Sequence, residues 1–301
     1  SATAFRIHRF SMSQVRFGRD RPSIRARHAS RQSCRGEIEP AIPELHRLNR
    51  TSRQNKTHAR ILSTPRYPIK LATFDIEISN IFDLGPGEDL VKYAPFDISV
   101  AATHVAGGQE QHWYSKLPDG TPATNLTADD AGRMLEYLET LQKQGHALVA
   151  WNGLSFDLRW IGHAAGDMAT ARRVALQLYD PMFQFFKLKG FPIGLAKAGQ
   201  GMGIRMSKLM DGADAPKRWM AGEHQAVFDY VMGDVRLTAA IATAIIDAGE
   251  VRWVTQRGST SSVRMPRLRT IEDCLADPMP DQSWMDTPIL ESSFAGWLDE
   301  A

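Results

Sequence analysis

Four carboxylates lie in segments of the chain that are otherwise apolar. Asp75 and Glu77 stand two residues apart in one apolar run, Asp157 follows a second run, and Asp234 interrupts the apolar stripe of a long helical segment. A half-buried carboxylate close to like charges is unfavourable, and a bound cation would relieve the repulsion. Oxygen donors without accompanying His or Cys suit Mg²⁺ or Mn²⁺ and argue against structural zinc. Carboxylates that hold two such ions about 3.5–4 Å apart are a standard means of cleaving phosphodiesters.

The segments that carry these acids alternate between strand and helix. Strands are predicted at residues 70–78, 96–104, 109–115 and 147–151. Helical spacing is found over 127–144, near 155, near 167 and over 225–248. In the first strand, Asp75 and Glu77 share one face about 7 Å apart, whereas Phe74 and Ile76 point the other way. This order of elements predicts an α/β domain with a mixed sheet.

Each acid also has an interpretation without function. Asp75 and Glu77 fit a strand end that emerges into solvent, and Asp157 suits the first turn of a helix capped by Ser155. Asp234 fits a salt bridge to an arginine elsewhere in the chain, or a tolerated edge position. These interpretations leave unexplained why two strand ends and one apolar helix stripe all carry carboxylates.

Three short motifs resemble those of the DEDD 3′–5′ exonucleases of the RNase H-like superfamily. Phe74-Asp75-Ile76-Glu77 is similar to the first motif, Asp-x-Glu, and residues 152–157 are similar to the second, Asn-Gly-x-x-Phe-Asp. Tyr230 four residues before Asp234 is similar to the third motif of the tyrosine (DEDDy) subclass. The segments Leu178–Pro181 and Ile193–Ile204 resemble the region between motifs two and three. The resemblance covers about residues 69–250 and is closest to proofreading domains of family-B polymerases, which implies an RNase H-like mixed sheet flanked by helices.

The resemblance implies that the four acids hold two divalent metal ions, Mg²⁺ or Mn²⁺. Asp75, Glu77 and Asp234 would bind the catalytic ion, and Asp75 would bridge to a second ion that Asp157 helps to fix. Tyr230 would orient the attacking water.

The same resemblance implies a nucleic-acid substrate, from whose 3′ end nucleoside 5′-monophosphates are released. Asn152 would contact the terminal nucleotide, whereas Phe74 and Phe156 would be packing residues. Asp180 is interpreted as structural, because nothing in the motifs requires a fifth acid. Gly199, Gly201 and Gly203 are interpreted as a loop or helix end, because no strand precedes them.

Charge divides the chain unevenly. Residues 1–60 carry 14 basic and 4 acidic side chains, whereas the other residues carry 22 basic and 30 acidic, a net charge of −8. Such an acidic core suits short single-stranded ends better than a long duplex, because a duplex grip needs a dense basic stripe. Small basic clusters occur at Lys187 with Lys189, Arg205 with Lys208, and Lys217 with Arg218, and ordinary solvated surface is the simpler interpretation of them.

Composition predicts three parts: a disordered arginine-rich leader (1–66), a core domain (67–254), and an irregular tail (255–301) docked on the domain or on a partner. The motif resemblance implies that the core domain is an RNase H-like 3′–5′ exonuclease domain. The leader fits a transit peptide, a nucleic-acid-binding arm, or an extension without a specific role. We expect a cytoplasmic protein, or an organellar one if the leader is a transit peptide. Two cysteines exclude a disulfide framework, and no apolar run approaches the ~18 residues of a membrane span.

Two other functions remain compatible with the acids. A catalytically silent RNase H-like module would bind nucleic acid or protein through the same fold, although such modules are expected to have lost metal-binding acids. A phosphatase that uses Asp75 as nucleophile would normally carry a second Asp where Glu77 stands, and it leaves Tyr230 unexplained.

Overall fold

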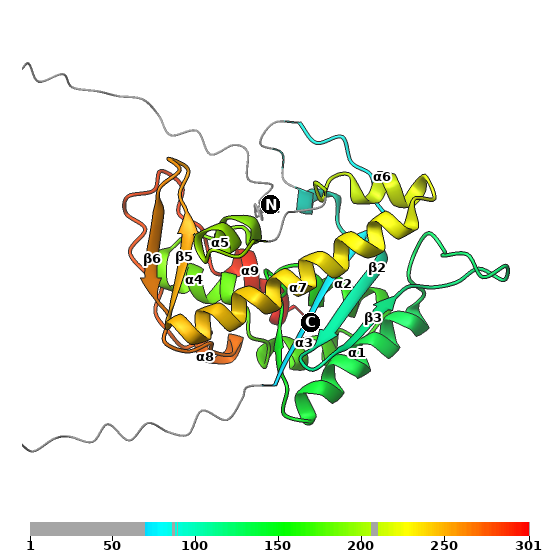
Figure 1. The fold of residues 1–301 in the computed structure, drawn as a ribbon, viewed down its shortest axis with the longest axis horizontal. Coiled ribbons are helices and arrows are strands. Elements are labelled where there is room, and N and C mark those ends of the chain that lie inside the picture. The colour runs from blue at the N-terminus through cyan, green and yellow to red at the C-terminus, as the bar shows by residue number, and fades with distance from the viewer. Residues whose placement is uncertain (1–69, 86–87, 89, 206–209, 301) are drawn as a thin grey trace, which may run out of the picture. The chain divides into compact units, whose positions relative to one another are not determined.

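A mixed four-stranded sheet lies at the centre of the structure (Figure 1), a computed structural model that describes residues 70–85, 88, 90–205 and 210–300. The predicted arginine-rich leader, residues 1–66, lies outside the described residues. The strands are β1 (Leu71–Ile78), β2 (Ile98–Val105), β3 (Gln109–Trp113) and β4 (Ala147–Val149). All four strands predicted from the sequence are confirmed, with each end within two residues of its predicted position.

The strand order is β3-β2-β1-β4. β1 runs antiparallel to β2 and parallel to β4, and β2 runs antiparallel to β3. The hairpin between β2 and β3 turns at Gly107 and Gly108, which both have positive φ angles. Together with helices on both faces, this sheet confirms the predicted fold class, an α/β domain with a mixed sheet flanked by helices.

The two faces of β1 contact different helices. Phe74 and Ile76 pack into a core formed with α1 (Ala128–Lys143), α2 (Asp157–Ala165) and α3 (Met168–Leu176). The opposite face of the sheet contacts α7 (His224–Ala248), which crosses β1 and β2 (Figure 1). Because side chains alternate along a strand, β1 buries apolar residues on the first face and presents polar ones toward α7.

Two of the helices that cover the sheet, α1 and α3, begin at side chains that satisfy their first N–H groups. Thr127 accepts the N–H of Asp130 at the start of α1. Asp167 accepts that of Thr170 at the start of α3, the helix that the sequence predicts near residue 167. The prediction that Ser155 caps the next helix is wrong. α2 begins at Asp157, and the Ser155 hydroxyl donates instead to the side-chain oxygen of Asn152.

The structure contains further short helices and a second, two-stranded sheet. They are η1 (Leu90–Tyr93), α4 (Pro181–Lys189), α5 (Leu195–Gly201), α6 (Ala215–Met220), β5 (Glu250–Val254), β6 (Thr260–Arg264), α8 (Ile271–Leu275), α9 (Ser292–Ala295) and η2 (Gly296–Leu298). As expected, Gly199 and Gly201 lie in the last turns of a helix, α5, and Gly203 follows it. Among the described residues, no helix is both long and apolar enough to cross a membrane.

The segment after residue 254 packs on the same core. β5 and β6 form an antiparallel hairpin, in which Val254 pairs with Thr260. The Phe294 ring lies 4.5 Å from that of Phe186 between ring centres, and Trp297 is buried in the same hydrophobic core as Phe74 and Ile76. Residues 255–300, for which irregular structure and short helices are predicted, thus include one strand and several short helices.

Of the predicted basic clusters, the one at Lys187 is not surface. The Lys187 side chain is only 2% exposed, and its ammonium group contacts the Glu291 carboxylate and the Asp277 carbonyl. Lys217 and Arg218 are exposed and form ion pairs with Asp214 and Glu223. Arg205 is exposed, and its expected partner Lys208 lies outside the described residues. Lys187 therefore ties α4 to the C-terminal segment.

Candidate metal centre

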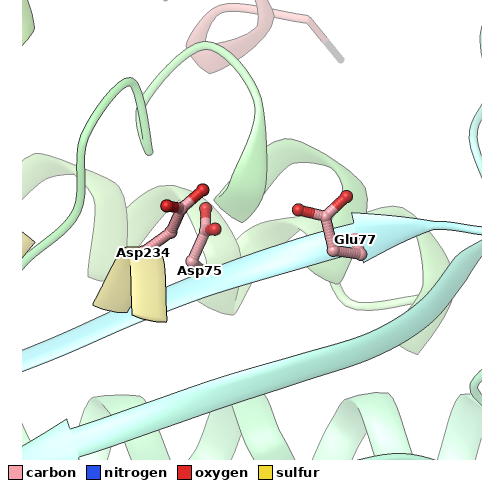
Figure 2. Close-up of side chains that lie close together, drawn as sticks. All are labelled: Asp75, Glu77 and Asp234. Atoms are coloured by element: carbon pink, nitrogen blue, oxygen red, sulfur yellow. The ribbon is translucent and has the colours of Figure 1, made fainter. Parts of the chain in front are cut away.

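β1 carries two of the predicted acids on its α7 side. Asp75 and Glu77 extend from the same face of the strand (Figure 2), whereas Ile76 between them is buried in the opposite core. Glu77 is 2% exposed, and Asp75 is half-buried. The alternation predicted from the sequence therefore delivers two carboxylates to one side of the sheet.

α7 brings the third acid to the same place. The Thr73 hydroxyl donates a hydrogen bond to the Val235 carbonyl at 3.2 Å, which joins β1 to the middle of α7. Asp234, the neighbour of Val235, is half-buried and lies beside Asp75 (Figure 2). Carboxylate oxygens of Asp75, Glu77 and Asp234 all lie within 4.8 Å of one another. Acids from a strand and from a distant helix thus form one cluster, which can bind a metal ion.

Asp157 approaches the cluster from the first turn of α2. Pairing between β1 and β4 ends at Thr73 and Val149, and Asp157 then accepts the backbone N–H of Ile76 at 3.0 Å on that open side of β1. Asp157 is 2% exposed, and its side chain forms a hydrogen bond with Asp75. It does not belong to the group of three acids within 4.8 Å, yet it lies close enough for its charge to act on Asp75.

The cluster is electrostatically unfavourable without a cation. The pKa of Asp75 is raised well above its ordinary value, first by burial and then by the charges of Asp157, Glu77 and Asp234. Part of the Asp75 side chain still reaches solvent, so a small ion can approach it. Four carboxylates without His or Cys form a hard oxygen donor set, which fits Mg²⁺ or Mn²⁺.

Tyr230 lies one helical turn before Asp234 and belongs to the same site. It is 3% exposed, and its side chain forms a hydrogen bond with Asp234. Burial and the charges of Glu77, Asp234 and Asp75 raise the pKa of the phenol far above its ordinary value. The hydroxyl therefore stays protonated at neutral pH and acts as a hydrogen-bond donor rather than as a base.

A tight turn between β4 and α2 places Asp157. Asn152 has a φ of 68°, and its side-chain oxygen accepts the Ser155 hydroxyl. Gly153 allows a close approach, because a Cβ atom there would lie 2.4 Å from the Cβ of Ala150. Asn152 is half-buried, and the structure shows it as a residue of this turn.

Asp180 has a second partner set that the sequence did not reveal. It caps α4 by accepting the N–H groups of Met182 and Phe183, as its position before Pro181 indicates. It also accepts the N–H groups of Asn152 at 3.1 Å and Leu154 at 3.2 Å. Burial raises its pKa to about 6 against the opposing effect of these four bonds. A buried acid is thus shared between a helix cap and the turn that leads to Asp157.

Trp297 also contacts this turn, and no signal in the sequence could have indicated it. Its indole N–H donates to the Leu154 carbonyl at 2.8 Å, and the side chain is 2% exposed. The residue belongs to the C-terminal segment, which carries none of the predicted motifs.

Comparisons with known proteins give a limited result. No family model and no curated protein matches the chain. Among solved structures, the chain is similar to a family B DNA polymerase from the hyperthermophilic archaeon Pyrobaculum calidifontis, with 16% sequence identity and a TM-score of 0.42. That similarity covers 60% of this chain and 25% of the polymerase chain. The chemistry of the site therefore has to follow from its own residues.

Proposed function

We propose that the protein is a metal-dependent 3′–5′ exonuclease, which hydrolyses phosphodiester bonds at the 3′ ends of nucleic acids. The observation that carries the proposal is the convergence of Asp75, Glu77 and Asp234, whose carboxylate oxygens lie within 4.8 Å of one another. Asp157 and Tyr230 lie beside this cluster, in contact with Asp75 and Asp234. The five residues are those that the motif resemblance selects from the sequence.

The donor set suits two divalent ions. Asp75, Glu77 and Asp234 would hold one of them, and Asp75 would share the second with Asp157. Bound ions of this kind make water more acidic and stabilise charge on the attacking and leaving oxygens. The raised pKa of Asp75 supports this assignment, because a divalent cation would offset both of its causes, burial and the repulsion of the neighbouring acids.

Tyr230 would position the attacking water through its protonated hydroxyl, whose oxygen can accept a hydrogen bond from the water while its proton is donated to Asp234. It cannot serve as the general base at neutral pH, because its pKa lies far above that range. Asn152, whose side-chain oxygen is occupied by Ser155, would have its amide N–H₂ group for the terminal nucleotide.

Single-stranded 3′ ends are the proposed substrate. The charge of −8 outside residues 1–60 disfavours a long phosphate-binding track, and the metal ions would instead provide the main attraction for phosphate. The polarity of digestion rests on the motif resemblance, so the test must measure it directly.

The test uses 5′-labelled and 3′-labelled single strands of DNA and RNA with Mn²⁺ or Mg²⁺. We expect stepwise shortening of the 5′-labelled strand, immediate release of a labelled mononucleotide from the 3′-labelled one, and no reaction in EDTA. Asp75→Asn and Asp234→Asn should abolish cleavage, whereas Asp247→Asn, an exposed acid on the same helix, should cleave normally. Binding without cleavage under all these conditions would instead support a catalytically silent module.

A further inference from the structure

The turn between β4 and α2 is held from two sides by residues outside the three motifs. We propose that Asp180 and Trp297 are positioning residues that fix this turn, and through it Asp157, at the metal centre. The C-terminal segment then forms part of the frame of the site. This inference rests on the proposed metal-dependent function.

The two carboxylate oxygens of Asp180 have different partners. Oδ1 accepts the N–H groups of Asn152, Met182 and Phe183, at 3.1, 3.0 and 3.1 Å. Oδ2 accepts the N–H of Leu154 at 3.2 Å. One oxygen therefore serves mainly as the helix cap, while the other is committed to the turn.

Trp297 completes the hold on Leu154. Its indole N–H donates to the Leu154 carbonyl at 2.8 Å, so side chains bind both backbone polar groups of Leu154. Such contacts suit a turn whose backbone is unusual, since Asn152 adopts a φ of 68°, a region that residues other than glycine rarely occupy.

The turn controls the place of Asp157. Leu154 precedes Asp157 by three residues, and the carbonyl of Gly153 accepts the N–H of Leu158 in the first turn of α2. Asp157 in turn reaches across to the N–H of Ile76 and to Asp75. A shift of the turn would therefore move Asp157 relative to the acids of β1, and shifts well below 1 Å matter to a metal site.

The C-terminal segment is anchored independently of this contact. Phe294 packs against Phe183 and Phe186 of α4, and the guanidinium of Arg172 donates to the Trp297 carbonyl at 3.3 Å. These contacts keep the indole in place, and they would keep a phenyl ring there in a variant. The indole N–H can thus be removed with the packing largely retained.

The experiment measures Mn²⁺ binding by titration calorimetry on the full-length protein, with thermal unfolding in EDTA alongside. Trp297→Phe removes the donor to Leu154 together with the pyrrole part of the indole and keeps an aromatic ring in the core. Asp180→Asn keeps an acceptor for the cap but turns an N–H₂ group toward the Leu154 N–H. We expect each variant to weaken Mn²⁺ binding on the order of tenfold, as residues that orient metal ligands do. We also expect excess Mn²⁺ to restore the cleavage rate.

The matched controls are Trp284→Phe and Asp167→Asn. Trp284 is 54% exposed and bonds to Asp281 in its own loop, and Asp167 caps α3 without contacting the turn. Both should bind Mn²⁺ as the wild type does. If Trp297→Phe and Asp180→Asn lower the unfolding temperature but keep wild-type Mn²⁺ affinity, the two residues only stabilise the fold and the inference is wrong.

The result separates this inference from the proposed function. A wild-type protein that cleaves and binds Mn²⁺, with both variants unchanged in affinity, overturns only the positioning role. A wild-type protein that binds Mn²⁺ without cleaving overturns the exonuclease, and the variants' affinities still decide the positioning role. A wild-type protein that binds no Mn²⁺ overturns both.

Discussion

Asp157 accepts the backbone N–H of Ile76, the residue between the two acids of β1, at 3.0 Å. This bond ties the first turn of α2 to the strand that carries Asp75 and Glu77, at the point where β4 no longer pairs with β1. The early end of β4 is therefore what gives Asp157 access to the site. Asp157 thus has two roles: one of its oxygens accepts the Ile76 N–H, and its charge raises the pKa of Asp75.

Asp157→Asn should lower activity and raise the stability of the metal-free protein. The amide oxygen can still accept the Ile76 N–H, but one of four clustered charges is removed, and with it part of the repulsion on Asp75. We expect cleavage to fall by a factor on the order of 100 and the unfolding temperature in EDTA to rise. Asp167→Asn, in a cap remote from the cluster, should change neither. If both stability and activity fell, the charge of Asp157 would not be destabilising the metal-free protein.

Tyr230→Phe should reduce the rate while leaving Mn²⁺ affinity unchanged. The hydroxyl is buried beside Asp234 and stays protonated, so its loss removes a hydrogen-bond donor and no metal ligand. We expect a rate loss of about 10- to 100-fold, within the range of a positioned proton donor or acceptor. Tyr137→Phe on α1 is the control. The test compares the cleavage rate at saturating Mn²⁺ with the Mn²⁺ affinity measured by calorimetry. A loss of Mn²⁺ affinity as large as the loss of rate would contradict the role of Tyr230 in positioning water.

The stability of the protein should depend on pH through Asp180. Its pKa is about 6 in the folded protein, against an ordinary value of 3.8. For this group the folded state therefore binds more protons than the unfolded state between these values. The contribution of Asp180 to the free energy of unfolding thus falls as pH rises from about 4 to 6 and then levels. Two pKa units correspond to about 3 kcal/mol.

Urea unfolding at pH 4.5, 5.5 and 6.5 tests this dependence. The raised pKa of Asp75 acts with the same sign, but it is present in both the wild type and Asp180→Asn. The difference between the two proteins therefore isolates Asp180. The variant should lose the part of the fall that Asp180 contributes and keep the part that Asp75 contributes. Parallel profiles for the two proteins would show that Asp180 is ionised throughout.

The sequence predicts most of the metal centre because its geometry is local. Side-chain alternation in a strand places Asp75 and Glu77 on one face, and helical spacing places Tyr230 and Asp234 on another, whatever the rest of the chain does. Each prediction needed only the few residues around the acids. In the structure, α7 packs on the polar face of β1, and this contact brings Asp234 to Asp75 and Glu77.

The supports of the site could not be predicted, because they depend on contacts between distant segments. Asp180 reads as a helix cap before Pro181, and nothing nearby in the sequence indicates that its second oxygen binds Leu154. Trp297 reaches Leu154 across 143 positions of the chain. Local preference predicts Ser155 as a helix cap, but its hydroxyl instead donates to the side-chain oxygen of Asn152, which has a positive φ angle.

Gly153→Ala should damage both stability and cleavage. A Cβ atom at this position would lie 2.4 Å from the Ala150 Cβ, and both atoms are fixed by the backbone, so the turn must move. Overpacking of this kind costs about 1–3 kcal/mol. Because the turn leads directly to Asp157, Mn²⁺ affinity should fall as well. Gly132→Ala is the control, since nothing lies within 4 Å of its Cβ position on α1 and the substitution should stabilise that helix by roughly 0.5–1 kcal/mol. A destabilised Gly153→Ala protein that retains full Mn²⁺ affinity would show that Asp157 keeps its place when the turn shifts.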